Sequence, residues 1–365
     1  MNKISEPASV VLNAVRFICS QGVLAGHLVV FFGLSCPFLV TMASYCVLMF
    51  FVLSGFLISH SLHSKKQKDP SYRFSDYFKD RFFRIFPPYI AALVLVFILD
   101  FVGFTLTGQY FSWTIYFGNF LINSLQMQEF PVATWLNEKY MLEIFRFHYF
   151  GTDLPLWTIA IEWWLYMFYG FLVFYFLCAE KIKAYRIPVL IALAIVPVYY
   201  ILVTARMERG LTLYWFLGVL LTSGSALLYL QNRLVFSISL LIVLFGIFGF
   251  SAIGPQGAIL VFILGLFLML QSSHFQFEKM NRFIQRLSEY AARYSYSLYL
   301  IHYSIIYFAT TVFHFEKNLT HFIIIYVVIN VVAFIFAEIF EKKSKHWKIK
   351  YENYRSGANR LQKKI

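Results

Sequence analysis

The feature that most constrains this chain is a series of apolar stretches, each long enough to cross a membrane. A hydrocarbon core about 30 Å thick needs roughly 20 helical residues to span it. Hydrophobic residues make up 60% of the 365 residues and charged residues only 13%, against about 25% in soluble domains. The sequence therefore predicts an all-α protein, a polytopic bundle of about ten transmembrane helices. The predicted spans are 10–34, 38–61, 87–107, 154–178, 187–205, 210–230, 234–252, 256–273, 294–314 and 321–340.

One further apolar segment, Phe111–Leu125, is interrupted by Asn119 and Asn123. We expect an interfacial or re-entrant piece there, although an eleventh span stays open. The transmembrane domain is predicted to cover residues 1–341. Residues 342–365 are expected to form a basic cytoplasmic tail, as a surface helix or partly disordered.

The net charge of +13 invites a nucleic-acid interpretation, but the distribution of the charges argues against one. With ten spans and a cytoplasmic N-terminus, 25 of the 31 Lys and Arg residues lie inside and 5 outside. This asymmetry follows the positive-inside rule. It predicts that both termini are cytoplasmic, that the chain is embedded in a plasma membrane such as the bacterial inner membrane, and that its basic residues contact anionic lipids.

Two polar residues, Arg16 and His27, share one face of the first predicted span. Their separation corresponds to about three helical turns, or roughly 16 Å along the axis. An Arg at the centre of a membrane helix costs at least about 2.5–3.5 kcal/mol, so it usually serves a pathway or a ligand. A histidine on the same face adds a group that moves protons near neutral pH. The alternative is an Arg that reaches the cytoplasmic interface and a His bonded to a neighbouring helix.

A basic and aromatic segment leads into the third predicted span. Residues 62–86 read LHSKKQKDPSYRFSDYFKDRFFRIF, and their second half predicts an amphipathic surface helix that ends at Pro87-Pro88. Arg81 and Arg84 are three residues apart and lie on one helix face. Guanidinium groups suit phosphate, so this pair is a candidate site for a nucleotide-bearing donor. Anchoring to lipid headgroups is the alternative.

The second span carries a small polar motif near its cytoplasmic end. Gly55 permits close approach of a helix or a ligand, and Ser54 can form a hydrogen bond across helices. Helix packing explains such a pair equally well.

Glu162 is an intramembrane carboxylate in the fourth span. It and His27 are each about seven or eight residues from the outer end of their spans, so similar depth is expected. A carboxylate beside a His orients the ring and raises its basicity. A structural Glu bound to an Arg or a hydroxyl is the alternative. In the ninth span we expect His302 to be a helix–helix hydrogen-bond partner, and we expect Glu338 and Glu341 to pair with the Lys-rich tail.

The sequence contains no metal-ligand spacing, Walker loop, dinucleotide-binding glycine pattern or nucleophile elbow. ATP-driven transport, redox chemistry and serine-type hydrolysis are therefore disfavoured, and no metal cofactor is expected.

Taken in order, five motifs resemble acyltransferase family 3, the integral-membrane O-acyltransferases that modify cell-envelope polysaccharides. The resemblance covers nearly the whole chain. The matching segments are Arg16 to His27 with ten residues between them, Phe50–Leu57, Arg81–Tyr89, Leu156–Tyr166 and Tyr294–Tyr303. Three departures accompany them: TMASYCVLM in place of a glycine-rich approach to Phe50, Trp163-Trp164 after Glu162, and EKK at Glu341–Lys343.

The resemblance implies a membrane O-acyltransferase. Its donor would be cytoplasmic acyl-CoA, acetyl-CoA by default, and its acceptor a hydroxyl of a saccharide such as O-antigen, capsule or exopolysaccharide. His27 matches the essential histidine, as general base or as acyl carrier, and Glu162 matches the fourth-span acid. The positions that match donor binding or site integrity are Arg16, Ser54, Gly55, Arg81 and Arg84.

Aromatic residues near the outer face are candidates for stacking on the sugar, and they are Trp113, Trp135 and Trp157. Two other functions use the same residues. A transporter or flippase of a lipid-linked saccharide would need the buried polar groups without covalent chemistry. A non-catalytic scaffold would tolerate replacement of Arg16 and His27.

Overall fold

A computed structural model describes residues 4–109, 112–128, 130–131, 149–179, 181–202, 210–224, 232–272 and 282–362. Every regular element in these residues is helical, and no strand occurs among them. Six of the described helical segments are long and apolar enough to cross a membrane. They are Glu6–Phe32, Pro37–Lys68, Phe74–Thr107, Leu154–Leu177, Phe250–Ser272 and Leu319–Tyr351. The predicted all-α membrane architecture is confirmed at this level, while ten crossings and the orientation of the termini stay predictions.

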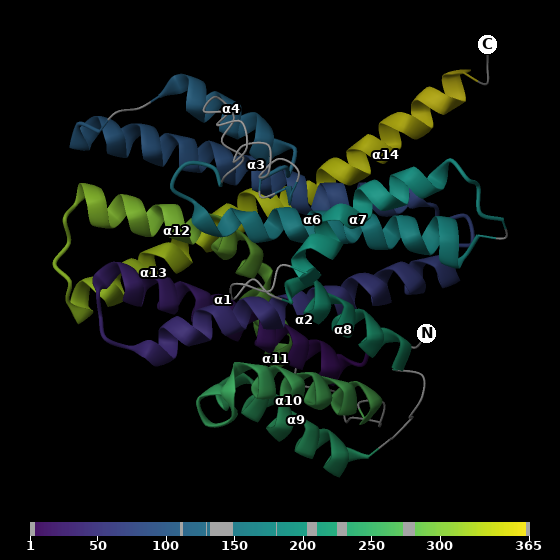
Figure 1. The fold of residues 1–365 in the computed structure, drawn as a ribbon, viewed down its shortest axis with the longest axis horizontal. Helices are drawn as coiled ribbons and strands as arrows, with labels where there is room; N and C mark the ends of the chain where they lie inside the picture. Colours follow the sequence, from purple (N-terminus) through teal and green to yellow (C-terminus); the bar gives the residue numbers. More distant parts are fainter. Residues whose placement is uncertain are drawn as a thin grey trace. The chain divides into compact units, whose positions relative to one another are not determined.

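The chain divides into two compact units, the first made of Met1–Tyr72 and Ile187–Ser295. Its helices are α1 (Glu6–Phe32), α2 (Pro37–Lys68), α7 (Arg186–Leu202), α8 (Leu211–Gly224), α9 (Arg233–Phe248), α10 (Phe250–Ser272) and α11 (Arg282–Arg293). A left-handed Gly33 (φ 60°) ends α1, and a short link returns the chain into α2. Helices α9 and α10 lie side by side as a hairpin (Figure 1).

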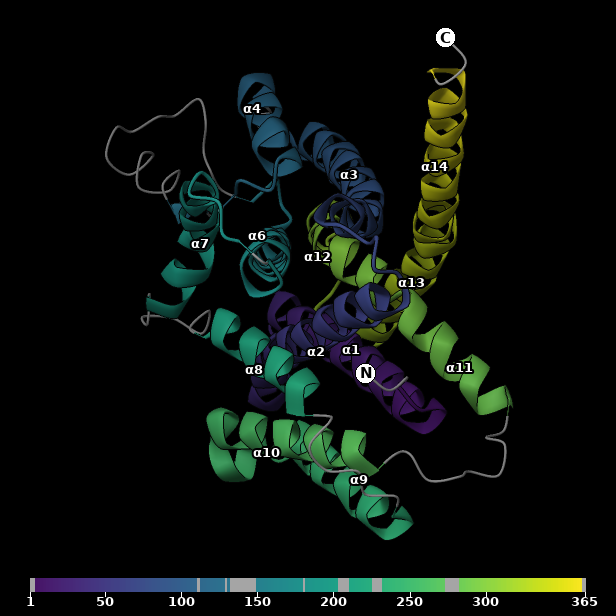
Figure 2. The ribbon, with the colours of Figure 1, turned by 90° about the vertical axis from the view of Figure 1, so that its right-hand side faces the viewer.

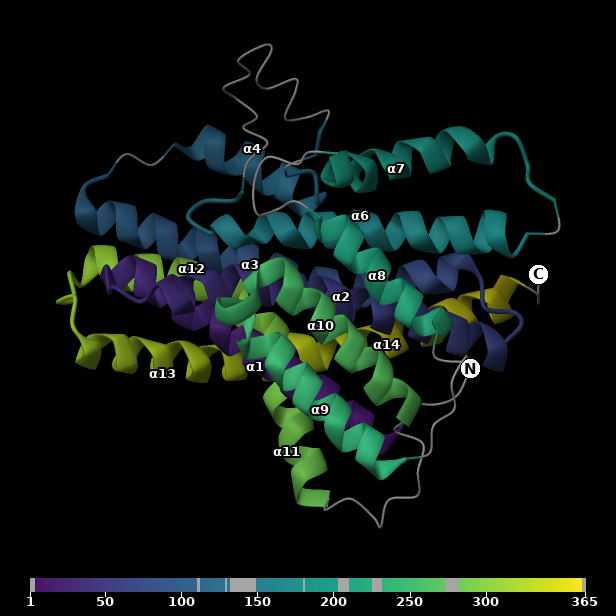
Figure 3. The same ribbon diagram turned by 60° about the horizontal axis from the view of Figure 1, so that its bottom comes forward.

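Close contacts between glycines and backbone hold the first unit together. A Cβ at Gly246 would lie 2.6 Å from the backbone of Phe262, so α9 and α10 approach at van der Waals distance. Helix α2 packs against α1, which is visible near the centre of Figure 2. Helix α8 runs along the same α2 (Figure 3). Small residues at such contacts are typical of helix packing in membranes.

The second unit comprises Arg73–Arg186 and Tyr296–Ile365. Its helices are α3 (Phe74–Thr107), α4 (Trp113–Ser124), η1 (Leu154–Leu156), α6 (Trp157–Leu172), η2 (Val173–Leu177), α12 (Ser295–Val312), α13 (Leu319–Phe336), η3 (Ala337–Glu341) and α14 (Lys342–Gln362). Helix α3 contacts α4, α6 and α14. Two elements, η2 and η3, are π-helical turns, which often occur at functional positions.

The predicted end of a surface helix at Pro87-Pro88 is wrong. Helix α3 continues from Phe74 through both prolines to Thr107. A proline inside a helix removes its own N–H donor and crowds the carbonyl of residue i−4. In a membrane helix, neighbouring helices can satisfy the backbone groups that this releases. The segment between these helices is therefore a turn between α2, which extends to Lys68, and the start of α3. Asp69 orders this turn by accepting hydrogen bonds from Ser71.

Two other segments are helical, and their expected places at the membrane surface stay predictions. Helix α4 has 12 residues and a length of about 18 Å, so it is shorter than the core of a bilayer. Residues 342–362 are helical and continue from α13 through η3 without a break. No observation tests the predicted domain boundary after residue 341.

Candidate functional site

The polar face of α1 binds the start of the ninth predicted span. Arg16 donates from Nη2 to the hydroxyl of Ser295 at 3.4 Å. One turn further along, Gln21 donates to the hydroxyl of Tyr294 at 3.4 Å. The first and the fifth sequence motifs therefore meet within the first unit, at Arg16.

His27 is half-buried on α1, next to the closest approach of α2. A Cβ at Gly26 would lie 2.5 Å from the carbonyl oxygen of Leu39, and one at Gly22 would lie 2.7 Å from Sγ of Cys46. These two glycines let the helices touch along the side of α1 that adjoins the histidine. Rigid backbone contact of this kind fixes the position of the His27 backbone, from which the imidazole extends. A fixed position suits a group that must transfer a proton.

Ser54 and Gly55 lie at the crossing of α2 and α8. A Cβ at Gly55 would overlap the carbonyl oxygen of Trp215, and the hydroxyl of Ser54 accepts a hydrogen bond from Nε1 of Trp215 at 3.2 Å. Trp215 is fully buried. These contacts give the motif a packing role, and its role in donor binding stays a prediction. Only its position in an apolar run distinguishes Trp215 in the sequence.

The Arg84 guanidinium is held by an acid from the far end of the chain. Nη1 of Arg84 lies 2.9 Å from Oε2 of Glu341. The other oxygen, Oε1, accepts from the backbone N–H of Ser297 at 3.0 Å and from its hydroxyl at 2.6 Å. Glu341 is 4% exposed. The expected pairing of Glu341 with the Lys-rich tail is therefore wrong, because η3 turns this side chain toward α3. Glu338 does pair with the tail, through Lys342 at 2.9 Å.

The side-chain interactions of Arg81 differ from those of its charged neighbours on α3. Lys79 pairs with Asp76 at 3.0 Å, and Lys348 pairs with Asp80. The guanidinium of Arg81 lies over the ring of Tyr77, 5.6 Å from its centroid. Its buried Nε atom has no hydrogen-bond partner among the described residues. Arg81 is thus a cation on a basic helix with donor capacity still available for an anion.

Glu162 lies on α6 and accepts a hydrogen bond from the hydroxyl of Tyr166 on the next turn. Its charge also acts on the hydroxyls of Tyr296 and Tyr299 in α12. His27 belongs to the first unit and Glu162 to the second, so their pairing stays a prediction. His302 is fully buried, and its Nδ1 lies 3.0 Å from the carbonyl oxygens of Leu298 and Tyr299 in its own helix. That contact is within one helix, and the expected bond of His302 to another helix stays a prediction.

The aromatic candidates have different environments. Trp113 is 61% exposed and packs on Phe97 and Phe101 of α3. Trp157 begins α6 and is half-buried. Trp135 lies outside the described residues.

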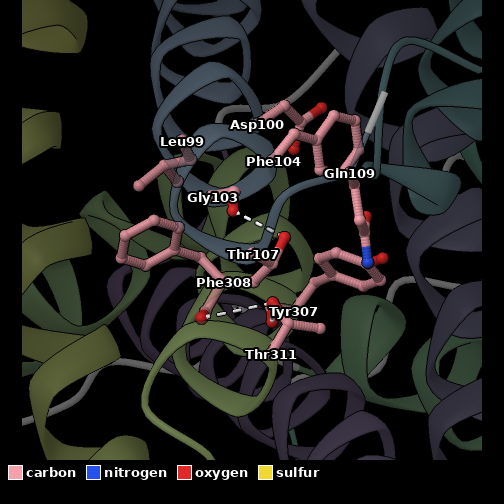
Figure 4. A pocket seen from close by; sticks show the side chains of 9 residues that line it. All are labelled: Leu99, Asp100, Gly103, Phe104, Thr107, Gln109, Tyr307, Phe308 and Thr311. Carbon is pink, nitrogen blue, oxygen red and sulfur yellow. Dashed lines mark hydrogen bonds between the residues drawn. The ribbon is translucent and has the colours of Figure 1, made fainter. Parts of the chain in front are cut away.

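A small hollow occurs between the C-terminal part of α3 and α12, and Figure 4 shows its lining. The hydroxyls of Thr107 and Thr311 point back to carbonyl oxygens of their own helices. Asp100 lines one side. Its carboxylate accepts from Thr152 N at 3.0 Å, Thr152 Oγ1 at 2.6 Å and the Tyr116 hydroxyl at 3.0 Å. The carboxylate is therefore engaged in structure, and the sequence interpretation passed over it.

The chain matches one family model, described as an acyltransferase domain (Acyl_transf_3), over residues 10–338. No curated protein and no solved structure matches it. The family model covers the five motifs and nearly the whole chain, and it confirms the resemblance drawn from them. Together with its apolar helices, the match makes this chain a multi-pass membrane protein that belongs to the acyltransferase 3 family.

Proposed function

We propose that this protein transfers an acyl group, acetyl by default, from cytoplasmic acyl-CoA to a hydroxyl of a cell-envelope saccharide at the bacterial inner membrane. Family membership supports the reaction class. The observation that supports a phosphate-bearing donor is the buried Nε of Arg81, which has no hydrogen-bond partner in the described part of the chain. A phosphate group would supply the missing acceptor, in the bidentate geometry that guanidinium favours.

In this proposal the two arginines of the RFFR segment have different tasks. Arg81 binds a phosphate of the CoA moiety. Arg84 positions the helix, since its guanidinium is already engaged by Glu341 at 2.9 Å. An arginine that is neutralised by a buried carboxylate is a poorer ligand for a second anion.

His27 is the proposed general base. Its unprotonated ring nitrogen takes the proton of the acceptor hydroxyl, and the oxygen attacks the thioester carbonyl carbon. The new C–O bond forms as the C–S bond breaks, and the CoA thiolate leaves with the proton returned by the imidazolium. The other role for His27 is that of an acyl carrier. It would leave label on the protein when labelled donor is supplied without acceptor.

Donor binding tests the role of Arg81. Purified protein in detergent is titrated with acetyl-CoA, and Arg81→Ala is compared with Lys79→Ala, which removes a neighbouring charge paired with Asp76. We expect Arg81→Ala to weaken binding at least tenfold and Lys79→Ala to change it less than twofold. Equal affinities for the two variants would contradict the assignment.

The transporter alternative makes a different prediction for the product. A flippase would move a lipid-linked saccharide without changing its mass, and acyl-CoA would have no effect on it. An acetyl transfer adds a defined mass to the glycan and depends on the donor.

A further inference from the structure

The second unit contains a group of buried polar side chains that lack partners. Gln126 is fully buried, and neither its amide oxygen nor its amide nitrogen makes a hydrogen bond with any described residue. The same holds for Oε1 of Gln128, which is 1% exposed, and for both carboxylate oxygens of Asp153, which is fully buried. Gln126 and Gln128 follow the end of α4, and Asp153 directly precedes η1. All three lie outside the helices that are long enough to span a membrane.

These side chains converge on one hydroxyl of α3. Nε2 of Gln128 donates to the hydroxyl of Tyr89 at 2.9 Å. The carboxylate of Asp153 and the amide of Gln126 also act on that hydroxyl. Asp153 acts in addition on the hydroxyl of Tyr299. Gln126, Gln128 and Asp153 therefore form one cluster, which we name the Tyr89 cluster.

The backbone is forced into an unfavourable conformation at the same place. Gln126 has φ 57°, in the left-handed region that residues with a side chain rarely adopt. Two contacts hold it there: its N–H donates to the carbonyl of Asn123 at 2.8 Å, and its carbonyl accepts from Nε1 of Trp164 at 2.7 Å. Strain of this kind persists where the surroundings impose it, and it concentrates at ligand-binding positions.

Leaving such groups unpaired is costly. A buried donor or acceptor without a partner costs about 1–3 kcal/mol, and native proteins rarely tolerate several together. Asp100 shows that this unit can satisfy a buried carboxylate, since three donors surround it. Asp153, close enough for the charge of Asp100 to act on it, has no such set of donors. A partner that the described residues do not supply explains the difference.

The chemistry of the cluster selects that partner. Its unpaired atoms are four oxygens that accept hydrogen bonds and one amide nitrogen that donates. A metal cation could bind these oxygens, but it offers no acceptor to the amide nitrogen of Gln126. A neutral molecule with several hydroxyl groups matches the set, because each hydroxyl both donates and accepts.

We infer that Gln126, Gln128 and Asp153 bind hydroxyl groups of the saccharide acceptor, as a recognition site within the second unit. The identity of the bound saccharide as an acceptor rests on the proposed function. Binding itself does not, because the site requires no donor and no transfer.

Saturation-transfer NMR with neutral methyl glycosides of glucose, galactose, mannose and rhamnose tests the inference on the full chain in detergent. The variants are Gln126→Gly, which accepts a positive φ and removes the amide, and Gln128→Leu. The matched control is Gln271→Leu, which removes a buried amide from the first unit. We expect at least one glycoside to give signals with the natural chain and the control, and at least fivefold weaker signals with both cluster variants.

Three results would overturn the inference. Equal signals from the natural chain and both cluster variants would show that the amides of Gln126 and Gln128 do not bind the glycoside. An absence of signal with every glycoside would leave ordered water as the partner. Stabilisation by Ca²⁺ or Na⁺ that is lost in the cluster variants would identify a cation site. The NMR experiment contains no acyl-CoA, so it tests glycoside binding separately from acyl transfer. If the chain binds glycosides but does not transfer an acyl group, the proposed function is wrong and the inferred binding site stands.

Discussion

Nη1 of Arg84 and Oε2 of Glu341 lie 2.9 Å apart, although 257 residues separate them in the chain. The same carboxylate accepts two hydrogen bonds from Ser297. This ion pair joins the basic start of α3, the first turn of α12 and the π-helical end of the last predicted span. It gives Arg84 a structural partner and leaves Arg81 as the candidate ligand for the donor.

We predict that Glu341→Gln destabilises the second unit. Breaking a buried ion pair costs about 3–5 kcal/mol, and the lower end applies because the Arg84 side chain is 40% exposed. Thermal unfolding in mild detergent measures the effect. Glu338→Gln is the control, since its exposed pair with Lys342 is worth about 1 kcal/mol or less. Equal losses in the two variants would contradict the assignment.

Gly55→Ala should disrupt the packing of α2 on α8. The added Cβ would overlap the backbone carbonyl of Trp215, which cannot rotate away as a flexible side chain can. Overpacking typically costs about 1–3 kcal/mol, and a clash with backbone is at the upper end. The control is Gly257→Ala, where the nearest atom is a side-chain carbon of Ile253 at 3.5 Å. The melting temperatures of the two variants test this prediction. If Gly55→Ala melts at the same temperature as the natural chain, α2 and α8 do not cross tightly at Gly55.

Asp153 should make stability depend on pH. Its pKa is raised in the folded chain by burial and by Asp100, while in the unfolded chain it is about 3.9. Between these two values the folded state binds the extra proton, so stability falls as pH rises through this window and levels off above the folded pKa. Asp153→Asn should remove that part of the decline and raise the melting temperature at neutral pH.

Melting temperatures measured in a pH series from about pH 4 to about pH 8 test this prediction. Asp69→Asn is the control, because Asp69 is exposed and only orders the turn at Ser71. The prediction is contradicted if the melting temperature of Asp153→Asn changes with pH as steeply as that of the natural chain.

The sequence predicted the helical membrane architecture because long apolar runs determine it directly. The roles proposed for Arg16 and the other site residues stay predictions, and the bond from Arg16 to Ser295 shows only that the polar face of α1 meets the Tyr294–Tyr303 motif. The sequence could not predict the partner of Glu341, because a π-helical turn changes which way a side chain faces. Pro87-Pro88 misled it for a related reason, since the rule that proline ends a helix weakens inside a membrane.

The Tyr89 cluster shows a further limit of sequence reasoning. Gln126, Gln128 and Asp153 are ordinary polar residues in a connecting segment, and only burial and missing partners distinguish them. The orphaned Nε of Arg81 became visible in the same way. Spacing along the chain identifies candidates, whereas hydrogen-bond accounting separates those that are already engaged from those that have capacity left.

Acyl transfer in membrane vesicles tests the central claim most directly. Vesicles that contain the natural chain or His27→Ala at matched abundance are supplied with labelled acetyl-CoA and envelope glycan. The account predicts label on the glycan with the natural chain and at least a hundredfold less with the variant, in keeping with loss of a general base. Equal labelling by both chains would contradict the role of His27. No label from a folded natural chain with acceptor present would contradict acetyl transfer itself.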